Sequence, residues 1–244
     1  MPMSYIFREH IQQSLAVIAF LITLTACTSE SYDAGDGPNS YLTADLVLLH
    51  TSQDKSVRSA LLDDGTTLQF SNPFAQDWLT RPDSVYRALL YYDKTVAASD
   101  AAASNPTATP IVRARSVRPV SVLRPVEAED METLRTDPVG FESMWLSKNG
   151  SYINLSLLLK SGKTEADDAM HALGIVSHGT TTDADRRRTL HLTLYHDQGG
   201  VPAYYTVQQY VSIPTQLLEE ADTIELTLNT CNGNKVVKVA VSNL

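Results

Sequence analysis

The chain has 244 residues, of which 43% are hydrophobic, 19% charged and 7% aromatic. This composition fits one or two globular domains and excludes collagen, a coiled coil and a polytopic membrane protein. The 19 Lys and Arg residues against 28 Asp and Glu residues leave a formal net charge of −9. Such an acidic surface disfavours binding to nucleic-acid phosphates or to anionic lipid headgroups.

The first 26 residues are typical of a bacterial secretion leader. A polar start containing Arg8 precedes an apolar run at 15–24, which is too short to remain as a membrane-spanning helix. The tetrapeptide LTAC at 24–27 follows, and it resembles the lipobox of bacterial lipoproteins, in which the cysteine is acylated and becomes the first mature residue. We expect residues 1–26 to be removed and Cys27 to carry lipid; the alternative is an ordinary thiol at the end of a signal peptide or of a buried amino-terminal helix.

Residues 27–40 are predicted to be a flexible stalk. After Cys27 the segment TSESYDAGDGPNS is polar, contains two glycines and a proline, and shows no apolar periodicity. Two or three acyl chains on one protein attach it firmly to a membrane. The sequence therefore predicts a cell-envelope protein anchored to the outer membrane by lipid, and whether it faces the periplasm or the outside stays open.

The cysteine count agrees with this location. Once Cys27 carries lipid, Cys231 is left without a partner, so we expect no internal disulfide. Cys231 lies in the segment NTCNG at 229–233, which is typical of a hairpin turn. We interpret it as a quiet, half-buried thiol and not as a nucleophile.

From Tyr41 the dominant hydrophobic period is two, which indicates an all-β chain. Alternation places Leu46 on one face together with its even-numbered neighbours, Leu42, Ala44 and Leu48. Asp64-Gly65 supplies a hairpin turn, and further strands are expected at 85–92 and 111–123. Four or five strands in about eighty residues suit a small closed barrel, so we assign residues 41–125 to an OB-like β-barrel.

The acidic segment EAEDMETLRTDP at 127–138 interrupts this pattern and suggests a domain boundary near residue 125. Beyond it, strands with one apolar and one polar face are expected, and a short helical turn is expected at 215–220. These strands are predicted at 153–159, 189–194, 205–213, 224–228 and 237–241. Strands that bury a single face pair as two facing sheets, so residues 126–244 are predicted to form a β-sandwich.

Several segments, taken together with the lipobox, resemble the NigD-like lipoproteins. They are SYLTADLVLLHT, ALLDDGTTLQF, ESMWLSKNGSYINLSLLL, TLHLTLYHDQGG and DTIELTLNTCNGNK. The resemblance covers essentially the whole chain and implies an amino-terminal OB-type domain and a carboxy-terminal β-sandwich. The family is named after a member encoded beside a bacteriocin, which suggests a role in immunity, but it implies no established activity and no functional residues. The loop DADRRR at 183–188 departs from the family's pattern.

Common catalytic motifs are missing from the chain, which contains no G-x-S-x-G, H-E-x-x-H or G-x-x-x-x-G-K-[ST]. His191 and His196 fall on opposite faces of a strand, as do His171 and His178, so none of these pairs is expected to bind metal. The aspartates at 63–64, 167–168 and 183–185 fit turns better than a calcium loop. We expect a protein that is not an enzyme and has no metal or cofactor; the alternative is a hydrolase with an unrecognised histidine and carboxylate.

An OB-like barrel also raises the possibility of nucleic-acid binding, because such barrels stack bases on aromatic side chains beside basic residues. The rings available are Trp78, Tyr86, Tyr91 and Tyr92, and the arginines are Arg113, Arg115, Arg118 and Arg124. The acidic net charge and the envelope location oppose this function. We expect the arginines to lie on the wet face of a strand or against the acidic segment at 127–138.

Trp145, Tyr204 and Tyr205 are predicted near loop ends, where exposed aromatic rings suit contact with a protein or a glycan. The alternative for Trp145 is that it closes one end of the sandwich core. The sequence therefore predicts a lipid-anchored protein with a binding role, whose partner is an envelope protein or an incoming toxin, bacteriocin immunity being one such role. The alternative function is that of a carbohydrate-binding accessory lipoprotein.

Overall fold

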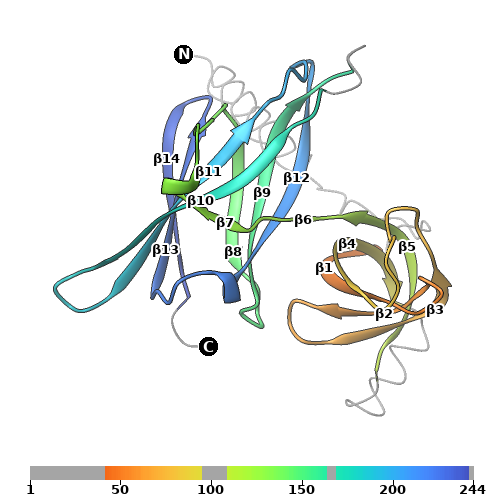
Figure 1. The fold of residues 1–244 in the computed structure, drawn as a ribbon. Helices are drawn as coiled ribbons and strands as arrows, with labels where there is room; N and C mark the ends of the chain where they lie inside the picture. The colour runs from red at the N-terminus through yellow and green to blue at the C-terminus, as the bar shows by residue number, and fades with distance from the viewer. Residues whose placement is uncertain (1–41, 95–108, 164–168, 242–244) are drawn as a thin grey trace, which may run out of the picture. The chain divides into compact units, whose positions relative to one another are not determined.

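The computed structural model describes residues 42–94, 109–163 and 169–241 (Figure 1). These residues form strands and short 3-10 turns, which confirms the predicted all-β class. None of the helices in this described part is long and apolar enough to cross a membrane. The predicted leader, Cys27 and the stalk lie outside the described residues.

The amino-terminal strands form a closed barrel in the order β1-β2-β3-β5-β4, as expected for an OB-type domain. Strand β1 pairs antiparallel with both β2 and β4, while β3 and β5 are parallel and close the barrel. The strands are β1 (Leu42–Thr51), β2 (Val57–Leu62), β3 (Thr67–Phe74), β4 (Val85–Lys94) and β5 (Ile111–Pro119).

The predicted Asp-Gly hairpin joins β2 to β3. Gly65 has a φ of +88°, a left-handed conformation that glycine adopts without a steric cost. The Leu62 N–H donates to the Thr66 carbonyl at 2.9 Å, and the Asp64 carboxylate accepts from the Thr66 N–H at 2.9 Å. This hairpin brings Asp63 and Asp64 to the edge of the barrel.

The side chains of odd-numbered residues in β1 point into the barrel. Val47 and Leu49 are fully buried there, whereas Leu46 lies outside the barrel in a separate cluster with Leu89 and Val120. The strand face that alternation assigns to Leu46 and its even-numbered neighbours is therefore the outer face of the barrel. It is buried at Leu46 because Trp145 and Tyr210 of the second domain pack against this cluster.

The remaining strands form two sheets (Figure 1). One has the order β14-β13-β11-β10-β7 and the other the order β6-β12-β9-β8. The first contains β7 (Pro125–Glu127), β10 (Ala172–Thr182), β11 (Arg188–Asp197), β13 (Thr223–Thr230) and β14 (Gly233–Ala240); the second contains β6 (Ser121–Val122), β8 (Gly140–Leu146), β9 (Tyr152–Ser161) and β12 (Tyr205–Pro214). The 3-10 turns η2 (Ala128–Asp130) and η3 (Thr215–Leu217) complete the described elements.

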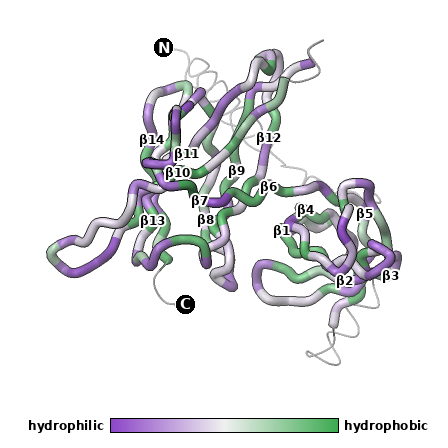
Figure 2. The backbone as a smooth tube through the Cα atoms, in the orientation of Figure 1, coloured by the Kyte–Doolittle hydropathy of each residue, from purple (hydrophilic) through white to green (hydrophobic). Residues whose placement is uncertain are grey.

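The two sheets enclose one aliphatic core. Its fully buried side chains include Leu155 and Leu157 from β9, Leu192 and Leu194 from β11, and Ile213 from β12. Hydropathy alternates along these strands, and the hairpin between β10 and β11 ends in polar residues (Figure 2). The predicted β-sandwich is confirmed.

The segment 121–127 serves both sheets. Strand β6 runs parallel to β12, and β7 runs parallel to β10. The sequence predicts one strand over 111–123, but β5 ends at Pro119, and the last contact with β4 is the Val120 N–H, which donates to the Arg87 carbonyl at 3.0 Å. Residues 121 and 122 pair within the sandwich instead.

Strands β8 and β10 were not predicted. Both have a register shift, between Phe141 and Ser143 in β8 and between Ser177 and Thr180 in β10. A bulge changes which face a side chain points to, so it removes the period-two signal on which the prediction depends.

Candidate functional site

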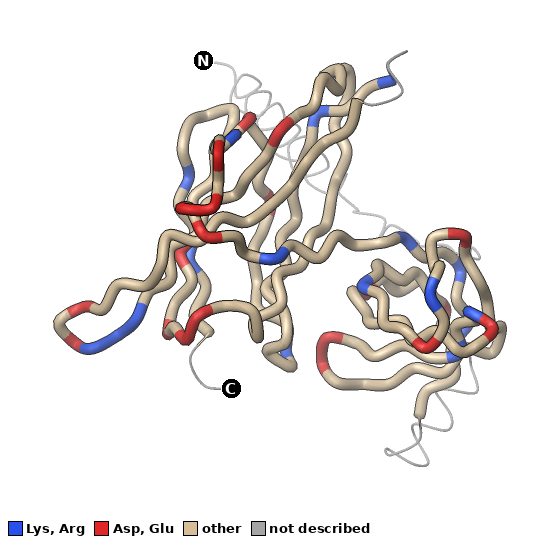
Figure 3. The backbone as a smooth tube through the Cα atoms, in the orientation of Figure 1, with Lys and Arg blue, Asp and Glu red and all other residues tan. Residues whose placement is uncertain are grey.

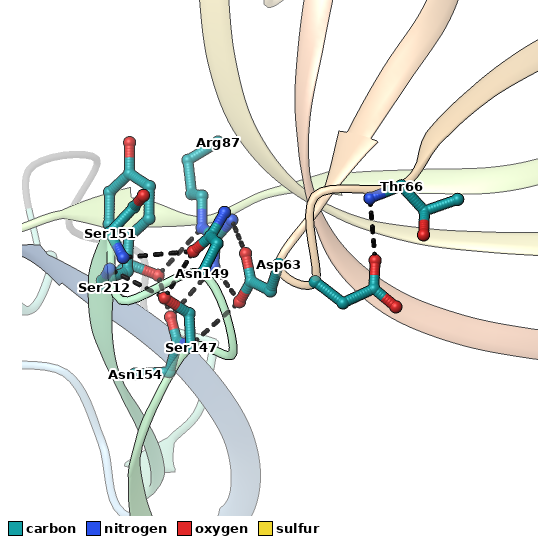
Figure 4. A network of polar contacts seen from close by, with 10 residues as sticks. Asp63, Thr66, Arg87, Ser147, Asn149, Ser151, Asn154 and Ser212 are labelled. Atoms are coloured by element: carbon teal, nitrogen blue, oxygen red, sulfur yellow. Dashed lines mark hydrogen bonds and ion pairs between the residues drawn. The ribbon is translucent and has the colours of Figure 1, made fainter. Parts of the chain in front are cut away.

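Arg87 on β4 connects the barrel to the sandwich through its buried guanidinium (Figure 4). It donates to both carboxylate oxygens of Asp63, at 2.5 and 2.7 Å, to the Ser212 hydroxyl at 3.1 Å and to the Asn154 side-chain oxygen at 3.0 Å. The guanidinium carbon also lies 4.3 Å from the centre of the Tyr152 ring. One side chain thus binds three partners on the sandwich and one on the barrel.

The partners of Arg87 also bind one another. Ser212 and Asn154 are opposite residues of β12 and β9, and the Ser212 hydroxyl donates to the Asn154 oxygen at 2.7 Å. The Asn154 amide donates to Asp63 at 3.0 Å, and the Asn149 N–H donates to the Asp63 carbonyl at 2.7 Å. The β2–β3 hairpin of the barrel is therefore held against the β8–β9 hairpin of the sandwich.

Sequence reasoning missed this network. On the strand predicted at 153–159, the polar face contains Asn154 and Ser156, but both side chains are buried. The barrel contacts cover Asn154, and the Ser156 hydroxyl donates to Glu142 at 2.6 Å while it accepts from Gln208 at 3.0 Å. The Ser156 hydrogen bond, and after it a hydrogen bond that the Gln208 amide donates directly to Glu142, hold the pKa of Glu142 below its ordinary value.

A cleft of about 360 Å³ lies beside the network, between the barrel and the β6-β12-β9-β8 sheet. Trp145 is in it, with its ring edge-on to Tyr210 at a centroid distance of 6.4 Å. Asp64 and Lys148 stand at the polar side, and the Thr66 N–H, together with Lys148, holds the pKa of Asp64 below its usual range. The cleft joins aromatic and charged groups from both domains.

The other predicted contact residues lie far from this cleft. Tyr204 is 78% exposed and Tyr205 is 51% exposed. Tyr205 pairs with Ser161 of β9 whereas Trp145 pairs with Asn154 of the same strand. Seven residues along a strand separate the two positions by about 23 Å. The three aromatic residues therefore do not form one site.

The four described histidines of the sandwich bind neighbouring groups. His171 and His196 stack at 5.2 Å, with Nδ1 of the first 3.0 Å from Nε2 of the second. His191 Nδ1 lies 3.0 Å from a Glu225 carboxylate oxygen on the open face of the sheet, and Lys238 binds the other oxygen at 2.8 Å. Within the described residues, no group of three or more His, Cys, Asp or Glu side chains is placed to hold a metal ion.

Lys238, and after it His191, hold the pKa of Glu225 below its ordinary value. The hydrolase alternative requires a histidine and a carboxylate facing a pocket. His191 and Glu225 instead lie among the outward-facing side chains of β11 and β13, because Leu190, Leu192 and Ile224 of these strands face the core.

The aromatic residues considered for nucleic-acid stacking do not share a face. Tyr92 lies inside the barrel, where burial and the Asp45 carboxylate raise its pKa. Trp78 packs edge-on against Tyr86 at 5.8 Å, and Tyr91 lines the cleft. Of the arginines, Arg115 pairs with Asp93 of β4 and not with the acidic segment at 127–138.

Cys231 is an exposed free thiol in the β13–β14 turn, where Thr230 pairs with Gly233. The predicted hairpin is confirmed, but the thiol is more accessible than the half-buried position expected.

The loop at 183–188 is the exposed tip of the β10–β11 hairpin, where acidic and basic residues adjoin (Figure 3). Asp183 accepts there from the N–H groups of Asp185 and Arg187, both at 2.9 Å. Asp167 and Asp168 lie outside the described residues.

A family model of the NigD-like C-terminal β-sandwich domain matches residues 122–241. This range contains both sheets of the sandwich, from the end of β6 through β14. The sandwich of this chain belongs to the NigD-like C-terminal domain family. In this NigD-like chain, Asn154 and Ser212 lie inside the matched domain, whereas Asp63 and Arg87 precede it.

Solved structures share the fold of this NigD-like chain. A NigD-like immunity protein from Bacteroides caccae is 21% identical, with a TM-score of 0.59, over 81% of this chain and 92% of that chain. A candidate toxin-related protein from Parabacteroides distasonis is 17% identical, with a TM-score of 0.56, over 81% and 92%. A candidate lipoprotein from Bacteroides fragilis is 13% identical, with a TM-score of 0.59, over 83% and 99%. A search of curated proteins finds no match.

Proposed function

We propose that this NigD-like chain is a lipid-anchored protein of the cell envelope that acts by binding a protein partner and not by catalysis. An incoming toxin is one such partner, which would make the chain an immunity protein. Support for the family role comes from the Bacteroides caccae neighbour, which is described as a NigD-like immunity protein. Support for the anchor comes from the LTAC tetrapeptide at 24–27 and from the Bacteroides fragilis neighbour, described as a candidate lipoprotein.

The observation that carries the binding role is the exposure of Tyr204 and Tyr205. Tyrosine side chains bury a large area at a small entropic cost, and they are enriched among the residues that dominate protein interfaces. Met170, which is 72% exposed, lies in the neighbouring loop, since a Cβ on Gly199 of the β11–β12 loop would touch its carbonyl oxygen. These loops offer an apolar contact surface at one end of the sandwich.

The binding role is tested by capture from solubilised envelopes with the tagged chain as bait. The Tyr204→Ala/Tyr205→Ala double variant should lose the partner that the wild type retains. Val236→Ala, which removes a 53% exposed apolar side chain from β14, should keep it. Equal recovery of the partner by the wild type and the double variant would show that these tyrosines are not part of the interface.

The same two tyrosines also suit stacking against a sugar ring, which supports a carbohydrate-binding role as the second candidate. Glycan arrays separate the two functions. Saturable binding to a glycan that is lost in the Tyr204→Ala/Tyr205→Ala variant, without a captured protein, would favour the accessory lipoprotein.

The anchor is tested independently through Cys27. Metabolic labelling with a fatty-acid analogue should mark the wild type in a globomycin-sensitive way, and Cys27→Ser should be unlabelled and released from the membrane fraction. A wild-type chain that carries no acyl group would refute the anchor. The binding role would then still be tested separately by the capture experiment.

A further inference from the structure

Strand β12 is paired on one side only along its first half. It pairs with β9 over its whole length, from Tyr205 to Pro214. On its other side, only Val211 and Ser212 pair, with the two-residue strand β6. Among the described residues, no strand adjoins this side of β12 at Tyr205–Gln209 (Figure 1).

The hydrogen bonds of β12 show which backbone groups this edge presents. The Thr215 N–H donates to the Ser151 carbonyl, so it faces β9, whereas the Ser212 carbonyl accepts from the Leu123 N–H on the β6 side. Backbone groups of successive residues in a strand point to alternate sides, and the β12–β9 register contains no shift. Thr206 and Gln208 therefore direct their N–H and C=O groups to the open side.

The chain leaves this edge because of two residues at the end of β5. Pro119 has no N–H to donate, and the Val120 N–H is bound to the Arg87 carbonyl of the barrel. A groove of about 280 Å³ opens where the chain diverges from β12. The residues that line both of its walls include Arg118, Pro119, Val120, Val207, Gln208 and Gln209.

The other edges of the two sheets are protected against pairing. Strand β14 carries Lys235 and Lys238, β8 has Glu142 and a register shift, and β7 is three residues long. Lysines, charges, bulges and short strands are the features that keep an edge from adding a further strand. The Tyr-Thr-Val-Gln-Gln stretch at 205–209 has none of them, and Tyr205 and Val207 are 51% and 36% exposed.

We infer that the open edge of β12, Tyr205–Gln209, takes an extended segment of a protein partner by β-strand addition. This rests on the proposed function in that the partner is a protein. Thr206 and Gln208 supply backbone hydrogen bonds, and Tyr205 and Val207 supply apolar contacts to alternate side chains of the added strand. The exposed Arg118 guanidinium, which forms no ion pair among the described residues, receives a carboxylate at the groove end of that segment.

Proline at Gln208 tests the backbone contacts. Its ring removes the N–H that faces the open side and leaves the hydrogen bonds to β9 in place, which is the position in which strands tolerate proline. Gln208→Thr is the matched control, because it loses the same side-chain contacts to Glu142 and Ser156 but keeps the N–H. Thr206→Pro is the second variant if Gln208→Pro does not fold as judged by circular dichroism.

The probe is a phage-displayed library of linear twelve-residue peptides selected on the full chain. Selected peptides should bind Gln208→Pro at least about tenfold more weakly than wild type, which is 1.4 kcal/mol, and bind Gln208→Thr within about twofold. Bound peptides should slow hydrogen exchange of the Thr206 and Gln208 amides. The peptides should also carry an acidic residue that strengthens binding to wild type but not to Arg118→Met.

Three results would overturn the inference. If peptides bind wild type and Gln208→Pro with equal affinity, they bind at another surface. Slow exchange of the Thr206 and Gln208 amides in the free chain means that the chain's own residues cover the edge. A wild-type dimer that Gln208→Pro dissociates identifies a second copy as the occupant. Envelope capture that still depends on Tyr204 would, in each case, leave the proposed function intact.

Discussion

The guanidinium of Arg87 binds Asp63 through both carboxylate oxygens, at 2.5 and 2.7 Å, where the arginine side chain is 1% exposed and the aspartate 20% exposed. A bidentate pair of this kind fixes orientation as well as distance. Because Arg87 also binds Asn154 and Ser212, the pair fixes the barrel hairpin against the sandwich. The cleft that contains Trp145 is bounded by the same two surfaces.

Replacing Arg87 with methionine should lower the free energy of unfolding by about 3 kcal/mol, because it leaves the Asp63 carboxylate and the Asn154 amide without their shared partner. Arg58→Met is the control, since Arg58 is 65% exposed and pairs with Asp54 at 3.8 Å; it should cost less than about 0.5 kcal/mol. Urea unfolding followed by circular dichroism measures both. Equal effects of the two substitutions would contradict a structural role for the buried pair.

The strands and hairpins that could be predicted are those in which apolar and polar residues alternate regularly. Strands β11 and β13 alternate buried and half-buried side chains, and turn residues such as Gly65 and Gly233 mark the hairpins between neighbours in the chain. Local patterns of this kind are contained in a short window of sequence. They were sufficient for the barrel, the sandwich and their order.

The junction network depends on residues that are distant in the chain. Arg87 is 125 residues from Ser212 and 67 residues from Asn154, so no local pattern joins them. Each gives a weak signal by itself, namely an arginine in the strand VYRALLYY and polar residues opposite each other in apolar strands. Only the strand register shows that the three meet. The open edge of β12 is equally hidden from local patterns, since it depends on where β6 begins to pair with β12.

Trp145 and Tyr204 should respond differently to truncation. Trp145→Ala removes the edge-on contact to Tyr210 and uncovers the cluster around Leu46, so it should cost about 2 kcal/mol of unfolding free energy. Tyr204→Ala removes an exposed ring and should change stability by less than about 0.5 kcal/mol. Urea unfolding monitored by circular dichroism compares them. A large loss for Tyr204→Ala would show that this ring is structural and would weaken its assignment to partner contact.

Gly199 should be the less replaceable of two adjacent glycines in the β11–β12 loop. Both have positive φ, +58° at Gly199 and +77° at Gly200, but a Cβ at Gly199 would lie 2.1 Å from the Met170 carbonyl oxygen, and one at Gly200 would meet nothing within 4 Å. Gly200→Ala should cost about 1 kcal/mol for the left-handed backbone alone. Gly199→Ala should cost at least about 2 kcal/mol more, because two loop backbones must separate. Thermal unfolding of the two variants would disprove the contact if their melting temperatures were the same.

His171 should make stability depend on pH between about 5 and 7.5. The His196 Nδ1 atom faces the Asp137 carbonyl and must donate to it, so its Nε2 atom accepts from His171 Nδ1. The buried Nε2 atom of His171 has no hydrogen-bond partner among the described residues. Burial, and then the neighbouring His196, hold the pKa of His171 below its ordinary value of 6.5.

The folded chain therefore binds the proton at His171 more weakly than the unfolded chain does. This stabilisation is complete above pH 6.5 and is lost as the pH falls through the lower folded-state pKa. The free energy of unfolding of wild type should decrease more steeply from pH 7.5 to about 5 than that of His171→Gln, which has no proton to bind at this position. Urea unfolding at a series of pH values gives both slopes, and nuclear magnetic resonance titration of the His171 ring gives its midpoint directly. Parallel slopes, or a midpoint above 6.5, would show that protonation is not penalised in the folded chain.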